Sequence, residues 1–109
     1  MFGRTGWGGA EKALNEEAFY SIRFGPQNRI HGHADGGALT LFRNGESILA
    51  DAGKYAYDHK DPMRAYVAGR AGHNVLDLRA VEYDTSAEVV LNSVHNTTST
   101  KMYCFTDRG

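Results

Sequence analysis

The chain has 109 residues, of which 41% are hydrophobic and 23% charged, with a formal net charge of -1. This size allows one globular domain at most, and with 12 Lys and Arg against 13 Asp and Glu no basic excess points to nucleic acid. No apolar run approaches the roughly 20 residues of a membrane span, and a single cysteine excludes an intrachain disulfide. We therefore expect neither nucleic acid nor a membrane among its partners.

Short apolar segments separated by glycine-rich turns predict a mainly β fold. Residues 10–18 (AEKALNEEA) are typical of a short helix, and residues 19–24 (FYSIRF) alternate as a strand does. Residues 38–43 and 46–51 flank Asn44-Gly45. This dipeptide is the strongest short signal of a hairpin, because a type I′ turn needs positive φ at both central positions.

The two-residue turn predicts the register of this hairpin: Arg43 with Glu46, Leu41 with Ile48, and Ala38 with Asp51. Asp51 then lies at the open end, where the preceding segment enters the hairpin. A straight strand would leave His33 about 16 Å beyond Asp51, at about 3.3 Å per residue. Contact between them therefore requires a bend, which we expect at Asp35-Gly36-Gly37.

The second half of the chain predicts one more helix and three strands. Asp61 followed by Pro62 is typical of an N-cap and first helical residue, so a short helix over 62–68 should end at Gly69. The expected strands cover 73–78, 88–94 and 101–106, the last two joined by a Ser/Thr/Asn-rich turn. Together these elements predict an antiparallel β-sandwich portion with one or two short helices, a single and incomplete domain spanning residues 1–109.

The segment His31-Gly32-His33-Ala34-Asp35 carries two imidazoles and a carboxylate within five residues. Imidazole and carboxylate are the usual non-thiolate ligands of zinc, and histidine can move protons near neutral pH. In a regular strand both imidazoles would point to one face. The plain alternative is a pair of surface or hydrogen-bonded histidines.

Two later residues could complete a metal site. Asp51 follows an apolar strand, and a buried carboxylate is costly unless it is paired or binds a cation; alternatively it only caps Gly53 in a turn. His73 follows a glycine, where it could instead be a structural hydrogen-bonding residue. With His33 they form two imidazoles and a carboxylate, a zinc set with room for a water or a fourth ligand.

A tyrosine group, Tyr55, Tyr57 and Tyr66, follows the hairpin, with Arg64 nearby. Tyrosines are usually half-buried packing residues. A phenol can nevertheless act as a general base and acid where nearby cations lower its pKa. An anionic ligand would have to rely on local arginines such as Arg29, Arg64 and Arg70.

Three known families contain related motifs. The metallo-β-lactamase fold carries His-x-His-x-Asp-His, which this chain matches up to Asp35 before departing at Gly36, where that fold has a metal ligand. The amidohydrolase barrel uses a bare His-x-His but needs repeated βα units, which this sequence lacks. The wider match, over residues 29–78, is the heparinase II/III-like family of polysaccharide lyases. The chain resembles the start of that family's β-sandwich in the order of five motifs: HGHAD at 31–35, LADAG at 49–53, YAY at 55–57, DPMRAY at 61–66 and GHNV at 72–75.

The resemblance implies β-elimination on a uronic-acid polysaccharide such as heparan sulfate, alginate, hyaluronan or a bacterial surface polymer. By position, His31 would line the active site, and His33, Asp51 and His73 would bind one mainly structural zinc ion. Tyr66 would match a tyrosine near the substrate by a looser alignment. Members of the family are mostly periplasmic or secreted, although the N-terminus MFGRTGWGG lacks the pattern of a signal peptide.

The same resemblance implies a missing partner. Family members also have a large α/α-toroid domain that supplies a catalytic tyrosine and an Asn or His, and nothing in these 109 residues corresponds to it. We therefore expect the isolated chain to be inactive. The alternatives are a non-catalytic zinc-stabilised module that binds a glycan or a partner, and a metallo-β-lactamase-like hydrolase; a homo-oligomer also remains open.

Overall fold

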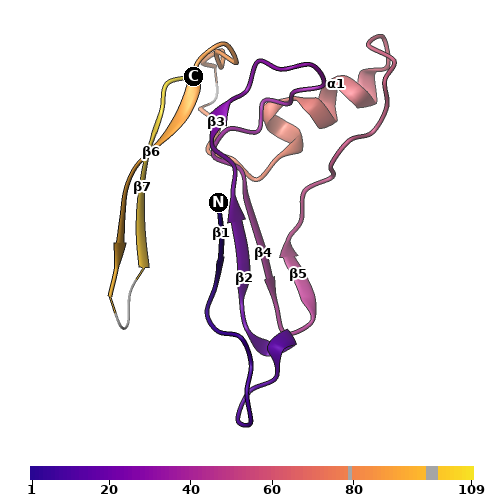
Figure 1. Ribbon diagram of the computed structural model, residues 1–109. Coiled ribbons are helices and arrows are strands. Elements are labelled where there is room, and N and C mark those ends of the chain that lie inside the picture. The colour runs from indigo at the N-terminus through magenta and orange to yellow at the C-terminus, as the bar shows by residue number, and fades with distance from the viewer. Residues whose placement is uncertain (79, 98–100) are drawn as a thin grey trace.

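Two antiparallel sheets make up most of the computed structural model, which describes residues 1–78, 80–97 and 101–109 (Figure 1). One sheet has the order β1-β2-β4-β5, and the other has the order β3-β6-β7. The predicted mainly β, antiparallel fold is therefore confirmed. The strands are β1 (Phe2–Arg4), β2 (Phe19–Ile22), β3 (Gly25–Pro26), β4 (Leu39–Arg43), β5 (Glu46–Leu49), β6 (Glu88–Asn96) and β7 (Lys101–Asp107).

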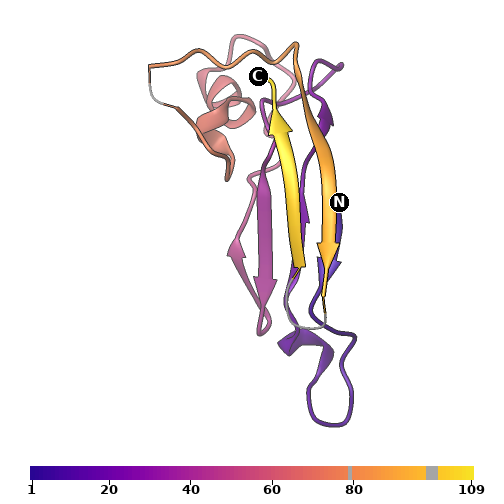
Figure 2. The same ribbon diagram turned by 90° about the vertical axis from the view of Figure 1, so that its left-hand side faces the viewer.

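The two sheets lie face to face, with β6 and β7 in front of the four-stranded sheet in Figure 2. The phenol oxygens of Tyr20 on β2 and Tyr103 on β7 are 2.5 Å apart. The rings of Phe24 and Phe105 lie 5.9 Å apart between the sheets. Val89 on β6 is fully buried. These side chains form the core of the sandwich, because alternate residues of each strand face inward.

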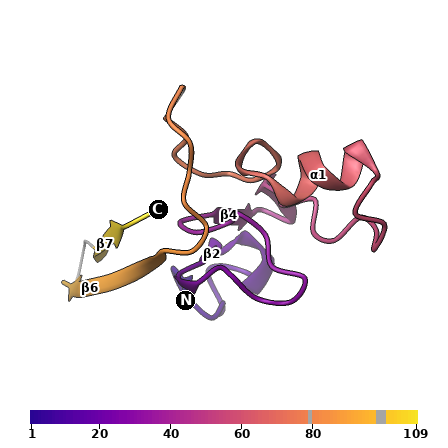
Figure 3. The same ribbon diagram turned by 90° about the horizontal axis from the view of Figure 1, so that it is seen from above.

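The helix predicted over residues 62–68 is confirmed as α1 (Pro62–Ala68). The Asp61 carboxylate accepts a hydrogen bond from the Met63 N–H at 2.8 Å, and proline occupies the first turn, where its missing N–H costs nothing. Seen from above in Figure 3, α1 lies on the side of the four-stranded sheet away from β6 and β7. No helix in the described ranges is long and apolar enough to cross a membrane.

The helix predicted over residues 10–18 is wrong. The structure has only a 3-10 turn, η1 (Leu14–Glu16), with no buried residue. The segment lacks the apolar stripe that stabilises a short helix by packing. Glu17 instead turns inward, where its carboxylate accepts hydrogen bonds from Thr5 at 2.6 Å and Lys12 at 3.1 Å. Strand β1, which pairs with β2, was not expected.

The hairpin is confirmed around Asn44-Gly45, where both residues have positive φ. Its predicted register holds for Arg43 with Glu46 and continues through Phe42 with Ser47. It fails at Leu41, where an irregularity pairs that residue with Leu49 rather than Ile48. β5 therefore ends at Leu49, and Asp51 lies in the loop that follows.

The strand predicted over residues 73–78 is also wrong. A second 3-10 turn, η2 (Arg70–Gly72), leads into an irregular segment. One backbone bond, from the Leu39 N–H to the Asn74 carbonyl at 3.0 Å, ties its beginning to β4. Further on, the Arg70 guanidinium donates to the Leu76 carbonyl, so side-chain bonding replaces a strand ladder there.

Candidate metal centre and active site

His31 and His33 lie on a turn rather than a strand. The Gly32 N–H bonds the Arg29 carbonyl at 2.8 Å and closes the turn, and His31 has a left-handed φ of 62°. This conformation is uncommon for a residue with a Cβ. The left-handed φ of His31 breaks the regular strand geometry that would point both imidazoles to one face. The two rings can therefore point in different directions.

Gly32 and Gly36 allow the close packing of this segment. A Cβ on Gly32 would lie 2.4 Å from the Gln27 carbonyl oxygen, and one on Gly36 would lie 2.7 Å from a Val89 methyl. Buried polar groups then fix Gly36: its N–H donates to the Gln27 side chain at 2.9 Å, and its carbonyl accepts from Arg70 at 2.7 Å. Such contacts hold the histidine turn against the sheets.

The predicted bend is confirmed just after the histidines. The Ala38 N–H bonds the Asp35 carbonyl at 2.9 Å, and Gly37 has a φ of 80°. The Asp35 carboxylate faces Arg23 at 3.7 Å. Asp35 therefore belongs to the bend and its ion pair.

Asp51 and His73 come together. The His73 Nδ1 donates to Asp51 Oδ2 at 2.6 Å, and Asp51 Oδ1 accepts from the Gly53 N–H at 2.8 Å. Burial raises the pKa of Asp51, but the bonds from His73 and Gly53 outweigh it, so the net pKa is lowered. The carboxylate thus caps the turn with one oxygen and pairs with the imidazole through the other.

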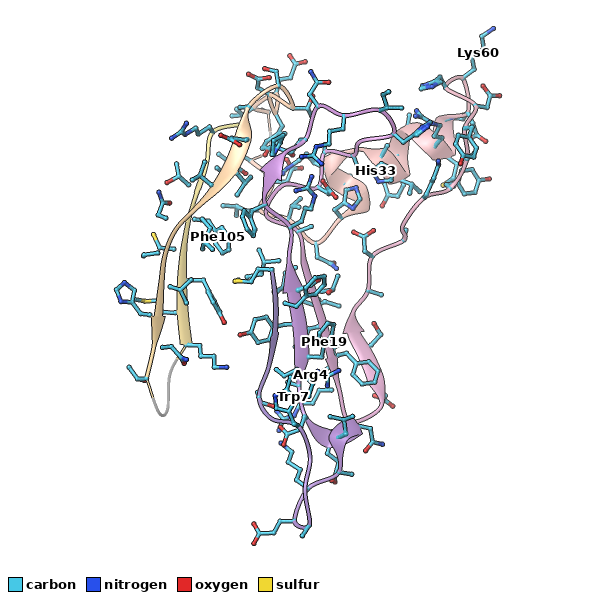
Figure 4. All side chains as sticks on the ribbon, in the orientation of Figure 1. Arg4, Trp7, Phe19, His33, Lys60 and Phe105 are labelled. Carbon is cyan, nitrogen blue, oxygen red and sulfur yellow. The ribbon has the colours of Figure 1, made fainter. Side chains whose placement is uncertain are left out.

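His33 is the third member of this group. Its ring centroid lies 5.2 Å from that of His73, at an interplanar angle of 45°. Figure 4 labels His33 close to α1. The His73 side chain is 1% exposed, and its Nε2 is buried without a hydrogen-bond partner among the described residues. In the arrangement of the described residues, no three His, Cys, Asp or Glu side chains are gathered closely enough to hold a metal ion.

His31 faces a different neighbour, Tyr57. The rings are in edge contact, with centroids 5.2 Å apart and an interplanar angle of 84°. The Lys54 ammonium lies 3.3 Å from the centre of the Tyr57 ring and lowers the pKa of this phenol. Of the three tyrosines noted in the sequence, Tyr57 therefore meets the expected chemical condition, a cation that stabilises its phenolate. The sequence signal for this was Lys54 three residues before it.

Tyr66 lies on the exposed side of α1, with 57% of its surface accessible. Within the described ranges, no hydrogen bond or ring contact joins its side chain to the histidine turn. Neighbouring Arg64 donates to the Ala56 carbonyl at 3.2 Å and so fixes the loop that carries Tyr57. The structure therefore brings Tyr57, and not Tyr66, against His31.

A polar hollow of about 330 Å³ opens beside the histidine turn, lined in part by Arg29, His33 and Ala68. Arg29 is exposed, and its guanidinium makes no ion pair or hydrogen bond with any described residue. Arg70, by contrast, is buried and bonded to backbone carbonyls. Of these two arginines, Arg29 is available to an anionic ligand.

Comparison with known proteins identifies the family. A family model described as heparinase II/III-like, C-terminal, matches residues 2–102. No curated relative and no solved structure shows significant similarity. The match spans nearly the whole chain, including the histidine turn, the hairpin, α1, β6 and the first two residues of β7. The chain therefore belongs to the heparinase II/III-like family and is a polysaccharide-lyase-related β-sandwich module.

Proposed function

We propose that this module forms the β-sandwich side of a lyase active site that cleaves uronic-acid polysaccharides by β-elimination. One observation carries the proposal: the turn at Gly32 directs His31 toward Tyr57, while His33 lies beside His73. One histidine is thus free for substrate, and the other is placed for a structural role. This arrangement argues against a two-metal hydrolase in which both histidines share a metal centre.

The reaction sets two demands on the protein. A base must remove the C5 proton, which lies α to the uronate carboxylate, and an acid must protonate the O4 leaving oxygen as the glycosidic bond breaks. The C5 proton is weakly acidic, so positive donors must lie where charge develops on the carboxylate. Arg29 is suited to this second demand, because its guanidinium, which pairs with none of the described residues, can bind a carboxylate in bidentate fashion.

His31 and Tyr57 are suited to proton transfer. The imidazole can take or give a proton near neutral pH. The Lys54 cation lowers the pKa of Tyr57, which makes its phenol a better proton donor and leaves more phenolate to act as a base. We assign His31 a proton-transfer or charge-stabilising role. The Tyr57 ring is in edge contact with His31, and we assign Tyr66 a place near the substrate from the family resemblance alone.

We propose zinc as the metal for His33, Asp51 and His73, which the described arrangement brings near one another without gathering them into a ligand shell. Two imidazoles and a carboxylate are a common zinc donor set, and the buried Nε2 of His73, which has no partner among the described residues, is a group that a metal or a water would satisfy. Because Asp51 bonds His73 Nδ1, Asp51 would join His73 Nε2 on one ion only after that bond is released. When bound, the metal would link the histidine turn, the loop after β5 and the segment after η2. These residues would thereby fix the turn that presents His31, with no part in the proton transfer itself.

We propose that an α/α-toroid domain, as the family resemblance implies, supplies the rest of the active site. The described residues contain one α-helix, α1, of seven residues. We therefore expect little lyase activity from this chain alone, and robust turnover by it would contradict the proposal. A chimera with a family toroid domain should release the ultraviolet-absorbing unsaturated uronate.

His31→Ala in that chimera should lower the rate by about a hundredfold or more, the usual contribution of general acid–base catalysis. His59→Ala, in an exposed loop, is the matched control and should leave the rate unchanged. Glycan binding that survives His31→Ala without any product would instead indicate a non-catalytic binding module.

A further inference from the structure

A second surface of the molecule combines exposed aromatic rings with cations. We call it the Trp7 surface; it consists of Phe2, Arg4, Trp7, Phe19 and Lys101. Trp7 is 82% exposed and Phe2 is 75% exposed. Figure 4 shows Arg4, Trp7 and Phe19 together at the four-stranded sheet, well away from His33 near α1.

The strand register builds this surface. Arg4 on β1 pairs with Phe19 on β2, so both side chains emerge on one face of the sheet. The Phe2 and Phe19 rings are stacked, with centroids 6.0 Å apart and an interplanar angle of 15°. The Arg4 guanidinium lies 4.9 Å from the Phe19 ring centre and 5.2 Å from that of Trp7. These contacts keep the aromatic groups in place and half-cover Phe19, while Phe2 and Trp7 stay exposed.

A second cation reaches the same place from the other sheet. The Lys101 ammonium on β7 donates to the Arg4 carbonyl at 3.3 Å, and both residues line a hollow of about 390 Å³ with Trp7. No described carboxylate forms an ion pair with Arg4 or Lys101. The nearby Glu17 is bonded by Thr5 and Lys12, so its charge is already matched.

We propose that the Trp7 surface is a second, non-catalytic binding site for acidic polysaccharide. Exposed Trp and Phe rings offer flat apolar faces on which the C–H face of a sugar ring can stack. Arg4 and Lys101 offer charge-assisted hydrogen bonds to the carboxylates of a uronic-acid chain. The choice of an acidic glycan over another occupant rests on this charge complementarity, and its uronate class rests on the proposed function.

The site would hold a long polymer at a distance from His31. Binding at two places on one chain raises the effective concentration of substrate at the first site. The Trp7 surface would thus make the protein bind long polymers more tightly than short oligosaccharides.

Trp7 is the single tryptophan of the chain, so its fluorescence reports on this surface alone. The full chain is titrated with alginate hexasaccharide and, separately, with uncharged maltohexaose. We expect a saturable change in Trp7 emission with the alginate probe, weakened by added salt, and no saturable change with maltohexaose. The same alginate response should persist in His31→Ala, which separates this site from the proposed active site.

Matched lysine variants test the cationic part. Lys101→Gln should weaken alginate binding by about tenfold, as loss of one charge-assisted contact does. Lys60→Gln, at an exposed lysine distant from Trp7 in Figure 4, should leave it unchanged. Three outcomes would overturn the proposal: no saturable response to alginate, an equal response to maltohexaose, or emission that depends on protein concentration alone because a second copy covers the surface.

Discussion

His73 Nδ1 and Asp51 Oδ2, 22 residues apart in sequence, lie 2.6 Å apart and form the closest polar contact of the candidate metal centre. The Asn74 side chain supports the contact by donating to the Ala50 carbonyl at 2.8 Å. These bonds join the loop after β5 to the segment after η2. Their loss should therefore loosen both loops at once.

Asp51→Asn tests this link. The amide retains the shape of the carboxylate but removes its charge, so the metal-free protein should lose about 1.5–3 kcal/mol of unfolding free energy, typical of a hydrogen bond to a charged group. Urea denaturation with a chelator present measures this loss. Asp58→Asn is the matched control, because Asp58 accepts only the Lys60 N–H in an exposed turn. Equal stability of the two variants would contradict the link.

Gly32→Ala tests the histidine turn. The new Cβ would lie 2.4 Å from the Gln27 carbonyl oxygen and 2.9 Å from that of Arg29, so the backbone must shift. We expect about 1–3 kcal/mol of destabilisation, as for other overpacked sites. Gly9→Ala is the control, since its Cβ would meet nothing within 4 Å. A thermal melt in which Gly32→Ala matches Gly9→Ala would refute the packing argument.

Two of the six tyrosines, Tyr57 and Tyr20, should titrate in a defined order. The Lys54 ammonium lowers the pKa of Tyr57 from its ordinary 10.0. Burial and the Tyr103 hydroxyl raise the pKa of Tyr20 to about 12. NMR of ring-labelled tyrosines, assigned with Tyr57→Phe, should show Tyr57 ionising before Tyr20.

The lysine beside Tyr57 supplies the control for this titration. Lys54→Met should raise the pKa of Tyr57, while Lys60→Met, which removes an equal charge from the same loop, should affect it far less. An unchanged Tyr57 titration in Lys54→Met would show that the cation is not the cause.

Glu17 should contribute an acid-sensitive part of the stability. Hydrogen bonds from Thr5 and Lys12 lower its pKa below the ordinary 4.5. Because the folded pKa is the lower one, this contribution is present above the unfolded value and is lost as pH falls through the folded value. Glu17→Gln should therefore flatten the fall in melting temperature below pH 4.5. Glu11→Gln, at an exposed side chain, should keep the wild-type profile.

Local signals in the sequence predicted the elements with strong turn or cap chemistry. Asn44-Gly45 fixed the hairpin, and Asp61-Pro62 fixed the start of α1. The predictions failed where contacts between distant parts of the chain determine the local structure. The irregularity at Leu41 shifted the register, and Glu17 turned inward toward Thr5 instead of extending a helix.

The candidate site was predictable in part. The order of the motifs predicted that Asp51 and His73 belong together, and the structure places them in contact. The contact of His31 with Tyr57 was not predictable, because it depends on the left-handed φ of His31 and on the path of the loop after β5. The roles of His31 and Tyr66 and the binding of zinc stay predictions.

Metal content of the purified chain tests the central claim most directly. After expression with added zinc, elemental analysis should find about one zinc per chain, as for a structural site. Single substitutions His33→Ala, Asp51→Asn and His73→Ala should each reduce the content, while His31→Ala should retain it. Fewer than about 0.2 zinc per chain in the wild type, or loss of zinc in His31→Ala alone, would contradict the division of the two histidines.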